Sequence, residues 1–219
     1  MFLMSPYKRS FLELALDARA LKFGEFILKS GRVSPYFFNA SAISGGRQLQ
    51  ILGRCYRDAI IDKGIRFDGL FGPAYKGIPL ASSVAMAFAE ADQDYPVSFN
   101  RKEVKNHGEG GSLLGAPLIG QILAIDDVVT AGTAVRESFK FIANQGATLS
   151  SFCVAVDRQE RGQEDSGSAL AELADVFNLT PISIVTLDDI LAFTSNDPRF
   201  VSDVASRIDA YRSKYGVLV

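Results

Sequence analysis

From Gly45 onward, short apolar runs alternate with longer segments in which apolar residues recur every three or four positions. The short runs are typical of buried strands, and the longer segments are typical of helices that pack against a sheet. This alternation predicts an α/β fold with a mainly parallel central sheet flanked by helices. The expected strands are residues 69–72, 96–99, 121–125, 149–156 and 181–187, and the expected helices between them are residues 47–63, 77–91, 133–145 and 166–177.

Both ends of the chain have a different pattern. Residues 6–21 have a helical pattern, whereas residues 23–28 and 36–39 are short and rich in glycine and aromatic side chains. We interpret approximately residues 1–40 as a small N-terminal cap, or hood, over the sheet, within a single domain of residues 1–219. Residues 188–215 are helical by pattern, and Pro198 is expected in a first helical turn.

Composition and charge limit the function classes. With 47% hydrophobic residues, the chain can bury a substantial core, and its net charge of −2 without a long basic run does not favour nucleic-acid binding. Its apolar stretches are too short to span a bilayer, so no membrane partner is expected. Cys55 and Cys153 are far apart in the sequence, which indicates neither a disulfide framework nor a zinc site and favours a cytoplasmic protein.

The segment from Ile122 to Thr133 carries the clearest chemical signal. A buried strand runs into the acidic pair Asp126 and Asp127, and the sequence Thr-Ala-Gly-Thr then precedes a helix. Ligands of open α/β sheets bind beyond the carboxyl ends of the strands. Small residues there let backbone amides approach a phosphate, and the following helix adds its positive end. The segment therefore predicts an anion site.

The two carboxylates would repel a phosphate, so we expect them to face sugar hydroxyls or a developing positive charge. Neighbouring side chains on a strand point to opposite sides, so Asp126 and Asp127 need not share one role. An isolated acidic pair would more simply be a solvated strand end. The ordered combination of strand, acids, small turn and helix instead favours a phosphorylated ribose.

A second cluster is basic and is followed by glycines. Arg101, Lys102, Lys105 and His107, the chain's single histidine, lie close together ahead of Gly108, Gly110 and Gly111. Such a loop can close over a site, and its cations can neutralise a departing pyrophosphate. The simpler alternative is a solvated charged loop.

The segment from Ile122 to Thr133 resembles the phosphoribosyl pyrophosphate motif of type I phosphoribosyltransferases. Further segments, in the same order along nearly the whole chain, resemble the bacterial orotate phosphoribosyltransferase family: residues 29–39, 71–77, 100–111 and 157–162. The resemblance implies transfer of the phosphoribosyl group to N1 of orotate, giving orotidine 5′-phosphate and diphosphate in de novo UMP synthesis. It also implies a Mg²⁺ cofactor held mainly through the substrate, and a homodimer in which the loop from Arg101 to Gly115 serves the neighbouring subunit.

The resemblance also assigns site residues. The implied catalytic residues are Lys105, His107, Asp126 and Asp127. The implied contacts to phosphoribosyl pyrophosphate are Lys29, Tyr75, Lys76, Arg101, Lys102, Lys105, His107, Asp126, Asp127, Val128, Val129, Thr130, Ala131, Gly132, Thr133 and Ala134. The implied contacts to orotate are Phe37, Phe38, Thr130 and Arg158.

Two other functions fit part of the pattern. A phosphoribosyltransferase that takes uracil or a purine would share the sugar-phosphate site, but Phe37, Phe38 and Arg158 suit a planar carboxylated base better. A regulator that binds nucleic acid would need a basic face, which the slightly acidic composition does not offer.

Overall fold

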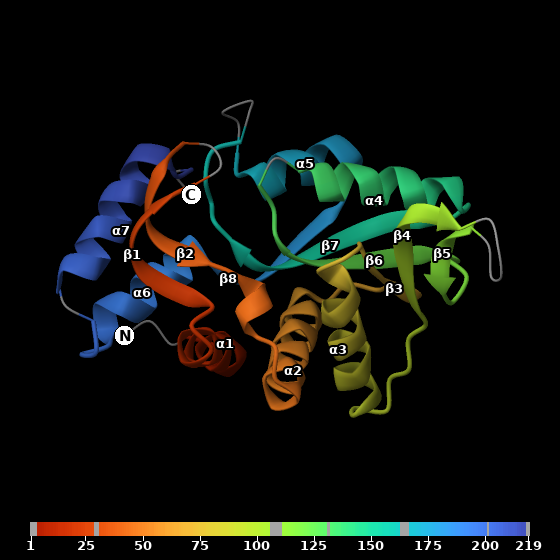
Figure 1. The fold of residues 1–219 in the computed structure, drawn as a ribbon, viewed down its shortest axis with the longest axis horizontal. Helices are drawn as coiled ribbons and strands as arrows, with labels where there is room; N and C mark the ends of the chain where they lie inside the picture. Colours follow the sequence, from red (N-terminus) through yellow and green to blue (C-terminus); the bar gives the residue numbers. More distant parts are fainter. Residues whose placement is uncertain are drawn as a thin grey trace.

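The protein is described by a computed structural model that covers residues 4–28, 31–105, 111–130, 132–162, 167–200 and 202–217. A single large sheet with the strand order β5-β4-β3-β6-β7-β8 forms its centre (Figure 1). All neighbouring strands pair in parallel except β4 and β5, which are antiparallel. The strands are β3 (Gly69–Gly72), β4 (Val97–Lys105), β5 (Gly111–Gly115), β6 (Gln121–Val128), β7 (Thr148–Asp157) and β8 (Thr180–Thr186).

Helices cover both faces of this sheet. One face carries α1 (Pro6–Asp17), α2 (Gly46–Lys63) and α3 (Gly77–Ala89), and the other carries α4 (Thr133–Asn144) and α5 (Ala169–Phe177) (Figure 1). Successive residues of β6 enter two different cores, since Leu123 and Ile125 belong to one cluster and Ile122 and Ala124 to the other. A strand that is buried on both faces needs apolar side chains at every position. This explains why the central strands were visible in the sequence as continuous apolar runs.

The hood is built from both ends of the chain. Strands β1 (Leu21–Ile27) and β2 (Val33–Phe38) form an antiparallel pair. The short 3-10 helix η1 (Ala40–Ala42) lies between β2 and α2 in the sequence. Helices α6 (Leu187–Asn196) and α7 (Ser202–Tyr215) lie beside them (Figure 1). The rings of Tyr36 and Tyr211 meet edge to face at 6.3 Å, which joins β2 to α7. The predicted N-terminal cap therefore includes C-terminal helices as well.

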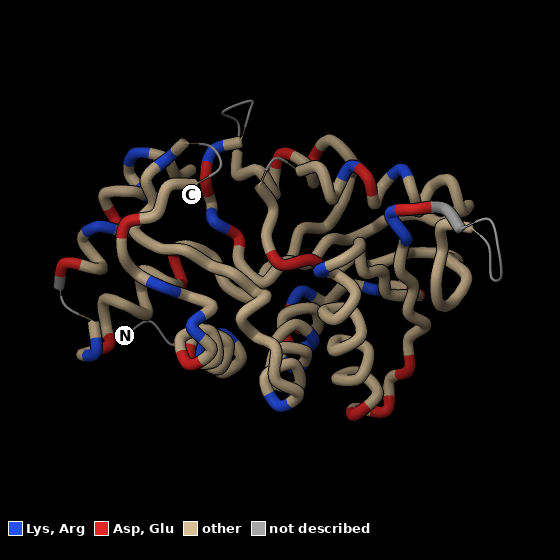
Figure 2. Tube along the Cα trace, viewed as in Figure 1, with Lys and Arg blue, Asp and Glu red and all other residues tan. Residues whose placement is uncertain are grey.

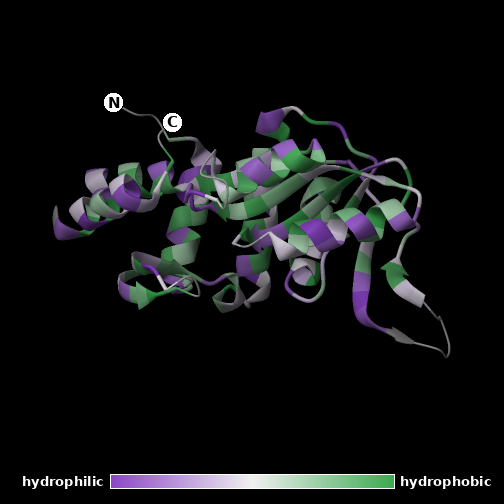
Figure 3. Ribbon diagram, turned by 90° about the horizontal axis from the view of Figure 1, so that it is seen from above, coloured by the Kyte–Doolittle hydropathy of each residue, from purple (hydrophilic) through white to green (hydrophobic). Residues whose placement is uncertain are grey.

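The predicted basic loop is in part a two-stranded arm. β4 continues to Lys105 and pairs with β5, with Asn100 opposite Leu113 and Lys105 opposite Gly111. The two strands project away from the rest of the sheet (Figure 3). The strand was expected to end at Phe99 because charged residues follow. Backbone pairing does not require apolar side chains where a strand extends beyond the layered core, so the apolar pattern underestimated its length.

The prediction for Pro198 was wrong. Helix α6 ends at Asn196, and Pro198 lies in the turn before α7. Asp197 is extended, with φ −112° and ψ 119°, as expected for a residue that precedes proline. Its side chain also accepts a hydrogen bond from the backbone N–H of Arg199 at 2.9 Å, which stabilises a turn instead of a helix.

Charged residues of both signs are interspersed along the chain (Figure 2). Within the residues that the structure describes, no helix is both long enough and apolar enough to cross a bilayer. Cys55 and Cys153 are buried free thiols.

The close crossing of α2 and α3 yields a stability prediction. A Cβ at Gly53 of α2 would lie 2.3 Å from the backbone oxygen of Ser83, whereas a Cβ at Gly46 of the same helix would meet nothing within 4 Å. We expect Gly53→Ala to lower the free energy of unfolding by about 1–3 kcal/mol, because the two helix backbones must separate. Gly46→Ala should be neutral or slightly stabilising. Urea unfolding of both variants measures the difference, and equal stabilities would contradict the observed packing.

Candidate active site

The acidic pair lies at the carboxyl end of β6, in the middle of the sheet. Asp126 and Asp127 are 8% and 5% exposed, so both carboxyl groups are nearly buried. The Asp127 side chain accepts a hydrogen bond from Val128 N at 3.0 Å, and the Asp126 side chain accepts one from Asp127 N at 2.8 Å. These backbone donors offset part of the cost of burying two acids.

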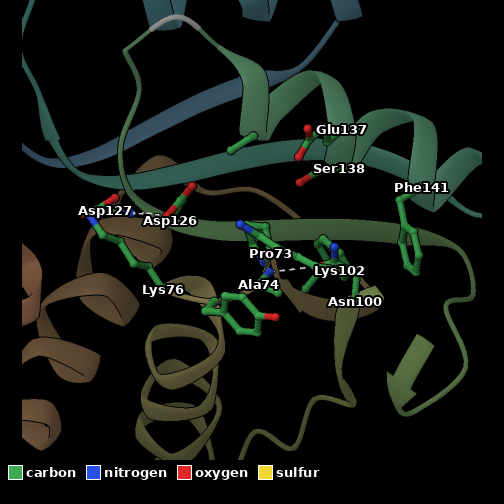
Figure 4. A pocket seen from close by; sticks show the side chains of 13 residues that line it. Pro73, Ala74, Lys76, Asn100, Lys102, Asp126, Asp127, Glu137, Ser138 and Phe141 are labelled. Carbon is green, nitrogen blue, oxygen red and sulfur yellow. Dashed lines mark hydrogen bonds and ion pairs between the residues drawn. The ribbon is translucent and has the colours of Figure 1, made fainter. Parts of the chain in front are cut away.

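The two carboxyl groups differ in their ion pairing. Asp127 forms an ion pair with Lys76, with 2.6 Å between Oδ2 and Nζ (Figure 4). Asp126 lines a cavity together with Ala134 and Ser138 of α4. Burial, followed by the charge of Asp127, raises the pKa of Asp126 to about 7. One acid is therefore paired, and the other is near its titration point at neutral pH.

This cavity has a volume of about 460 Å³ and brings together four parts of the fold that are separate in the sequence. Its walls come from the end of β3 with the turn that follows it, from β4, from the end of β6 and from the first turns of α4 (Figure 4). Of the predicted contacts to phosphoribosyl pyrophosphate, it is lined by Tyr75, Lys76, Lys102, Asp126, Asp127 and Ala134.

The β3–α3 turn presents cationic and aromatic groups to the cavity. Tyr75 is 65% exposed, and Nζ of Lys102 lies 5.2 Å from the centre of its ring. The turn contains a cis peptide bond between Ala74 and Tyr75, and Ala74 N donates a hydrogen bond to Oδ1 of Asn100 at 2.7 Å. Sequence reasoning did not assign a role to Asn100, because the bond joins the turn after β3 to the middle of β4, and only the fold brings these two segments together.

The turn after the acidic pair leads directly into α4. Gly132 has a left-handed backbone, with φ 75°, and a Cβ there would lie 2.5 Å from Leu173. Its N-cap residue, Gly132, has no side chain, and no side-chain cap of α4 is formed within the described part of the chain, so the amides of the first turn are left for another acceptor. Thr130 and Thr133 are exposed beside it. An uncapped helix start with a positive dipole is the arrangement predicted for a phosphate.

The predicted contacts to the base lie between β7 and the hood. Phe37 is 39% exposed and stacks on Phe26 at 5.5 Å, whereas the ring of Phe38 is 7% exposed and packs against Phe11. Only Phe37 thus offers an accessible aromatic face. Arg158 follows β7 and lies 4.6 Å from the centre of the Tyr36 ring.

Some predicted residues cannot be placed. Lys29, His107 and Ala131 lie outside the described residues, as does the side chain of Lys105, whose backbone ends β4. Arg101 lies on β4 and is partly exposed. Sequence reasoning also missed Tyr56, whose hydroxyl donates to the backbone oxygen of Asp126 at 2.8 Å. In the sequence, Tyr56 is one of many aromatic residues in a helical pattern, and nothing there indicates that its hydroxyl bonds the backbone of the acidic pair.

The fold and the site define a type I phosphoribosyltransferase, and residues 47–178 match the family model of the phosphoribosyl transferase domain. Orotate phosphoribosyltransferases of Klebsiella pneumoniae subsp. pneumoniae and Escherichia coli O45:K1 are each 53% identical to 98% of this chain, over 100% of their own length. A crystal structure of orotate phosphoribosyltransferase from Francisella tularensis superimposes with a TM-score of 0.85 and 37% identity, covering 94% of this chain and 99% of that one. The chain belongs to the orotate phosphoribosyltransferase family.

The raised pKa of Asp126 predicts a pH-dependent stability. The folded state holds a proton up to a pH of about 7, whereas the unfolded group releases it near its ordinary value of 3.8. The free energy of unfolding therefore falls as the pH rises from 3.8 to about 7. Above pH 7 the full cost of burying the ionised Asp126 remains. We expect Asp126→Asn to stabilise the fold at pH 8 by an amount on the order of a few kcal/mol, and by less at pH 5. Urea unfolding at both pH values tests this, with Asp94→Asn as an exposed control; no gain at pH 8 would contradict it.

Proposed function

We propose that this chain transfers the 5-phosphoribosyl group from 5-phospho-α-D-ribose 1-diphosphate to N1 of orotate, as a step of pyrimidine nucleotide synthesis in the cytoplasm. The observation that carries the proposal is the pair Asp126 and Asp127 at the end of β6, between Lys76 and the uncapped start of α4. Acids in the centre with anion-binding groups on both sides suit a ribose that carries phosphates at both ends.

In the proposed reaction, the bond from C1 of the ribose to the diphosphate oxygen breaks and its electron pair leaves with diphosphate. A bond from C1 to N1 of orotate forms, and N1 releases its proton. C1 becomes electron-poor during this exchange, so Asp126 and Asp127 hold the ribose hydroxyls and favour the positive ring. Lys76, Lys102 and Arg101 face the departing diphosphate, together with Lys105 and His107 from the arm.

The 5′-phosphate binds the turn from Val128 to Ala134, where the α4 amides, Thr130 and Thr133 act as donors. Val129, Ala131 and Gly132 shape this turn. Phe37, with Phe38 behind it, and Arg158 bind orotate, and Thr130 lies at its edge. Lys29 is assigned to the phosphosugar.

We further propose that Mg²⁺ reaches the site with its substrate. Mg²⁺ prefers oxygen ligands and usually keeps several waters beside substrate phosphates. Among the described residues, no group of three or more His, Cys, Asp or Glu side chains gathers as a metal site. Asp126, Asp127 and Glu137 line the cavity with carboxylate oxygens. When bound with the substrate, Mg²⁺ would supply positive charge beside the diphosphate oxygens.

A direct assay tests the reaction. Purified protein with orotate, phosphoribosyl pyrophosphate and Mg²⁺ should consume the ultraviolet absorbance of orotate and form orotidine 5′-phosphate, and chelation of Mg²⁺ should stop the reaction. Uracil and hypoxanthine serve as competing bases. An inert mixture, under conditions in which an authentic orotate phosphoribosyltransferase works, would contradict the proposal, as would a preference for either alternative base.

The proposed dimer and its shared arm predict a complementation result. Lys105→Ala should lower turnover at least about tenfold while the KM for orotate stays within about twofold, because the lysine acts on the leaving group. Lys63→Ala, at the exposed end of α2, is the charge control. Mixed with Asp127→Asn subunits, the Lys105→Ala protein should regain about a quarter of the wild-type rate, since half the dimers contain one intact site. No recovery after verified subunit exchange would show that the arm serves its own subunit.

A further inference from the structure

The guanidinium of Arg158 is fixed by Glu160, two residues further along the chain. Oε1 of Glu160 lies 2.7 Å from Nε and 2.5 Å from Nη2 of Arg158. Both side chains are largely buried, with 10% and 16% exposed. One edge of the planar guanidinium group is thus occupied by the carboxylate, and the ring of Tyr36 covers one of its faces at 4.6 Å.

Glu160 is in turn held from two other elements. The hydroxyl of Tyr211, from α7, donates to Oε1 of Glu160 at 2.7 Å. Nη1 of Arg32, just before β2, donates to Oε2 at 3.3 Å. Because both carboxylate oxygens have donors, the side chain of Glu160 cannot rotate without breaking several charge-assisted hydrogen bonds.

The backbone around this group is also restrained by the C-terminal segment. Arg161 N donates to the carbonyl of Tyr215 at 2.9 Å, and Val217 N donates to the carbonyl of Gln159 at 2.9 Å. Gln159 has a left-handed backbone, with φ 48°, and its N–H donates to the side chain of Asp157 at 2.9 Å. The turn that carries Arg158 and Glu160 is therefore fixed at both ends.

The arrangement leaves one edge of Arg158 for a ligand. Nη2 lies 3.4 Å from Oγ of Ser34, and no hydrogen bond between described residues uses Nη1. The two arginines and the one glutamate of this group carry one net positive charge in a largely buried setting. A planar anion such as a carboxylate fits an arginine edge of this kind.

We propose that Glu160 and Tyr211 are positioning residues for base recognition: they fix the plane and the direction of Arg158 so that it meets the carboxylate of orotate. This inference rests on the proposed function, in which Arg158 binds the base. It assigns a role in substrate choice to α7, a helix far from the phosphate-binding turns in the sequence. A residue of this kind should affect the KM for orotate and leave the KM for phosphoribosyl pyrophosphate unchanged.

The test measures both KM values for Glu160→Gln and Tyr211→Phe. Glu160→Gln should raise the KM for orotate roughly tenfold, and Tyr211→Phe roughly threefold, with the KM for phosphoribosyl pyrophosphate within about twofold in both. Isothermal titration with orotate should show the same loss of affinity. Tyr211→Phe keeps the ring that packs on Tyr36, so it decides the question if Glu160→Gln does not fold.

Matched controls separate this role from general loss of structure. Glu90→Gln breaks a similar bond to Arg54 Nε, 2.8 Å long, and Tyr7→Phe removes a tyrosine hydroxyl that donates to Asp62 at 3.1 Å. Both should leave the KM for orotate unchanged. An unchanged or lower KM for orotate in the Glu160 and Tyr211 variants, or equal rises in both KM values, would overturn the inference. If the wild-type protein itself were inactive with orotate, the proposed function would fail instead.

Discussion

Two neighbouring carboxyl groups are buried at the end of a parallel strand, and the surrounding structure compensates for the cost of keeping them there. Backbone N–H groups bond both side chains, and Lys76 neutralises Asp127. Asp126 forms no ion pair with another described residue, and its pKa is raised because burial and the charge of Asp127 outweigh the opposing effect of Lys76. Both side chains line the same cavity, and of the two it is Asp127 that pairs with Lys76.

The same constraint organises the charges around the substrate. Cationic groups that bind phosphate are also attracted to the buried acids and would neutralise their charge. Such cations must therefore lie at a distance from the acids, or a phosphate must be able to displace the acids from them. Lys76 is 55% exposed although it pairs with Asp127, so a phosphate can compete for its ammonium group. The start of α4 contributes backbone amides instead of a cation. In the proposed function, the acids then serve the sugar and the neighbouring donors serve its phosphates.

Sequence reasoning found those parts of the molecule that are encoded locally. The apolar runs of β6 and β7 and the order of groups from Asp126 to Thr133 all lie within short segments, so their pattern is readable. Pairings between distant segments are not readable in this way. The bond from Tyr56 to Asp126, the bond from Asn100 to Ala74 and the pairing of β4 with β5 depend on how the sheet is assembled.

In the proposed function, the two halves of the substrate are assigned mainly to different layers of the fold. Apart from Lys29, the residues assigned to the sugar and its phosphates lie within residues 47–178, the part matched by the general phosphoribosyl transferase domain. Phe37 and Tyr211 lie outside that range, in the hood, and Arg158 connects the two layers through Glu160 and Ser34. In this proposal, the phosphoribosyl transferase domain supplies the groups for the transfer reaction. The choice of base then depends on how β1, β2, α6 and α7 pack against that domain. A change in the hood can then alter which base is accepted without disturbing the acidic pair.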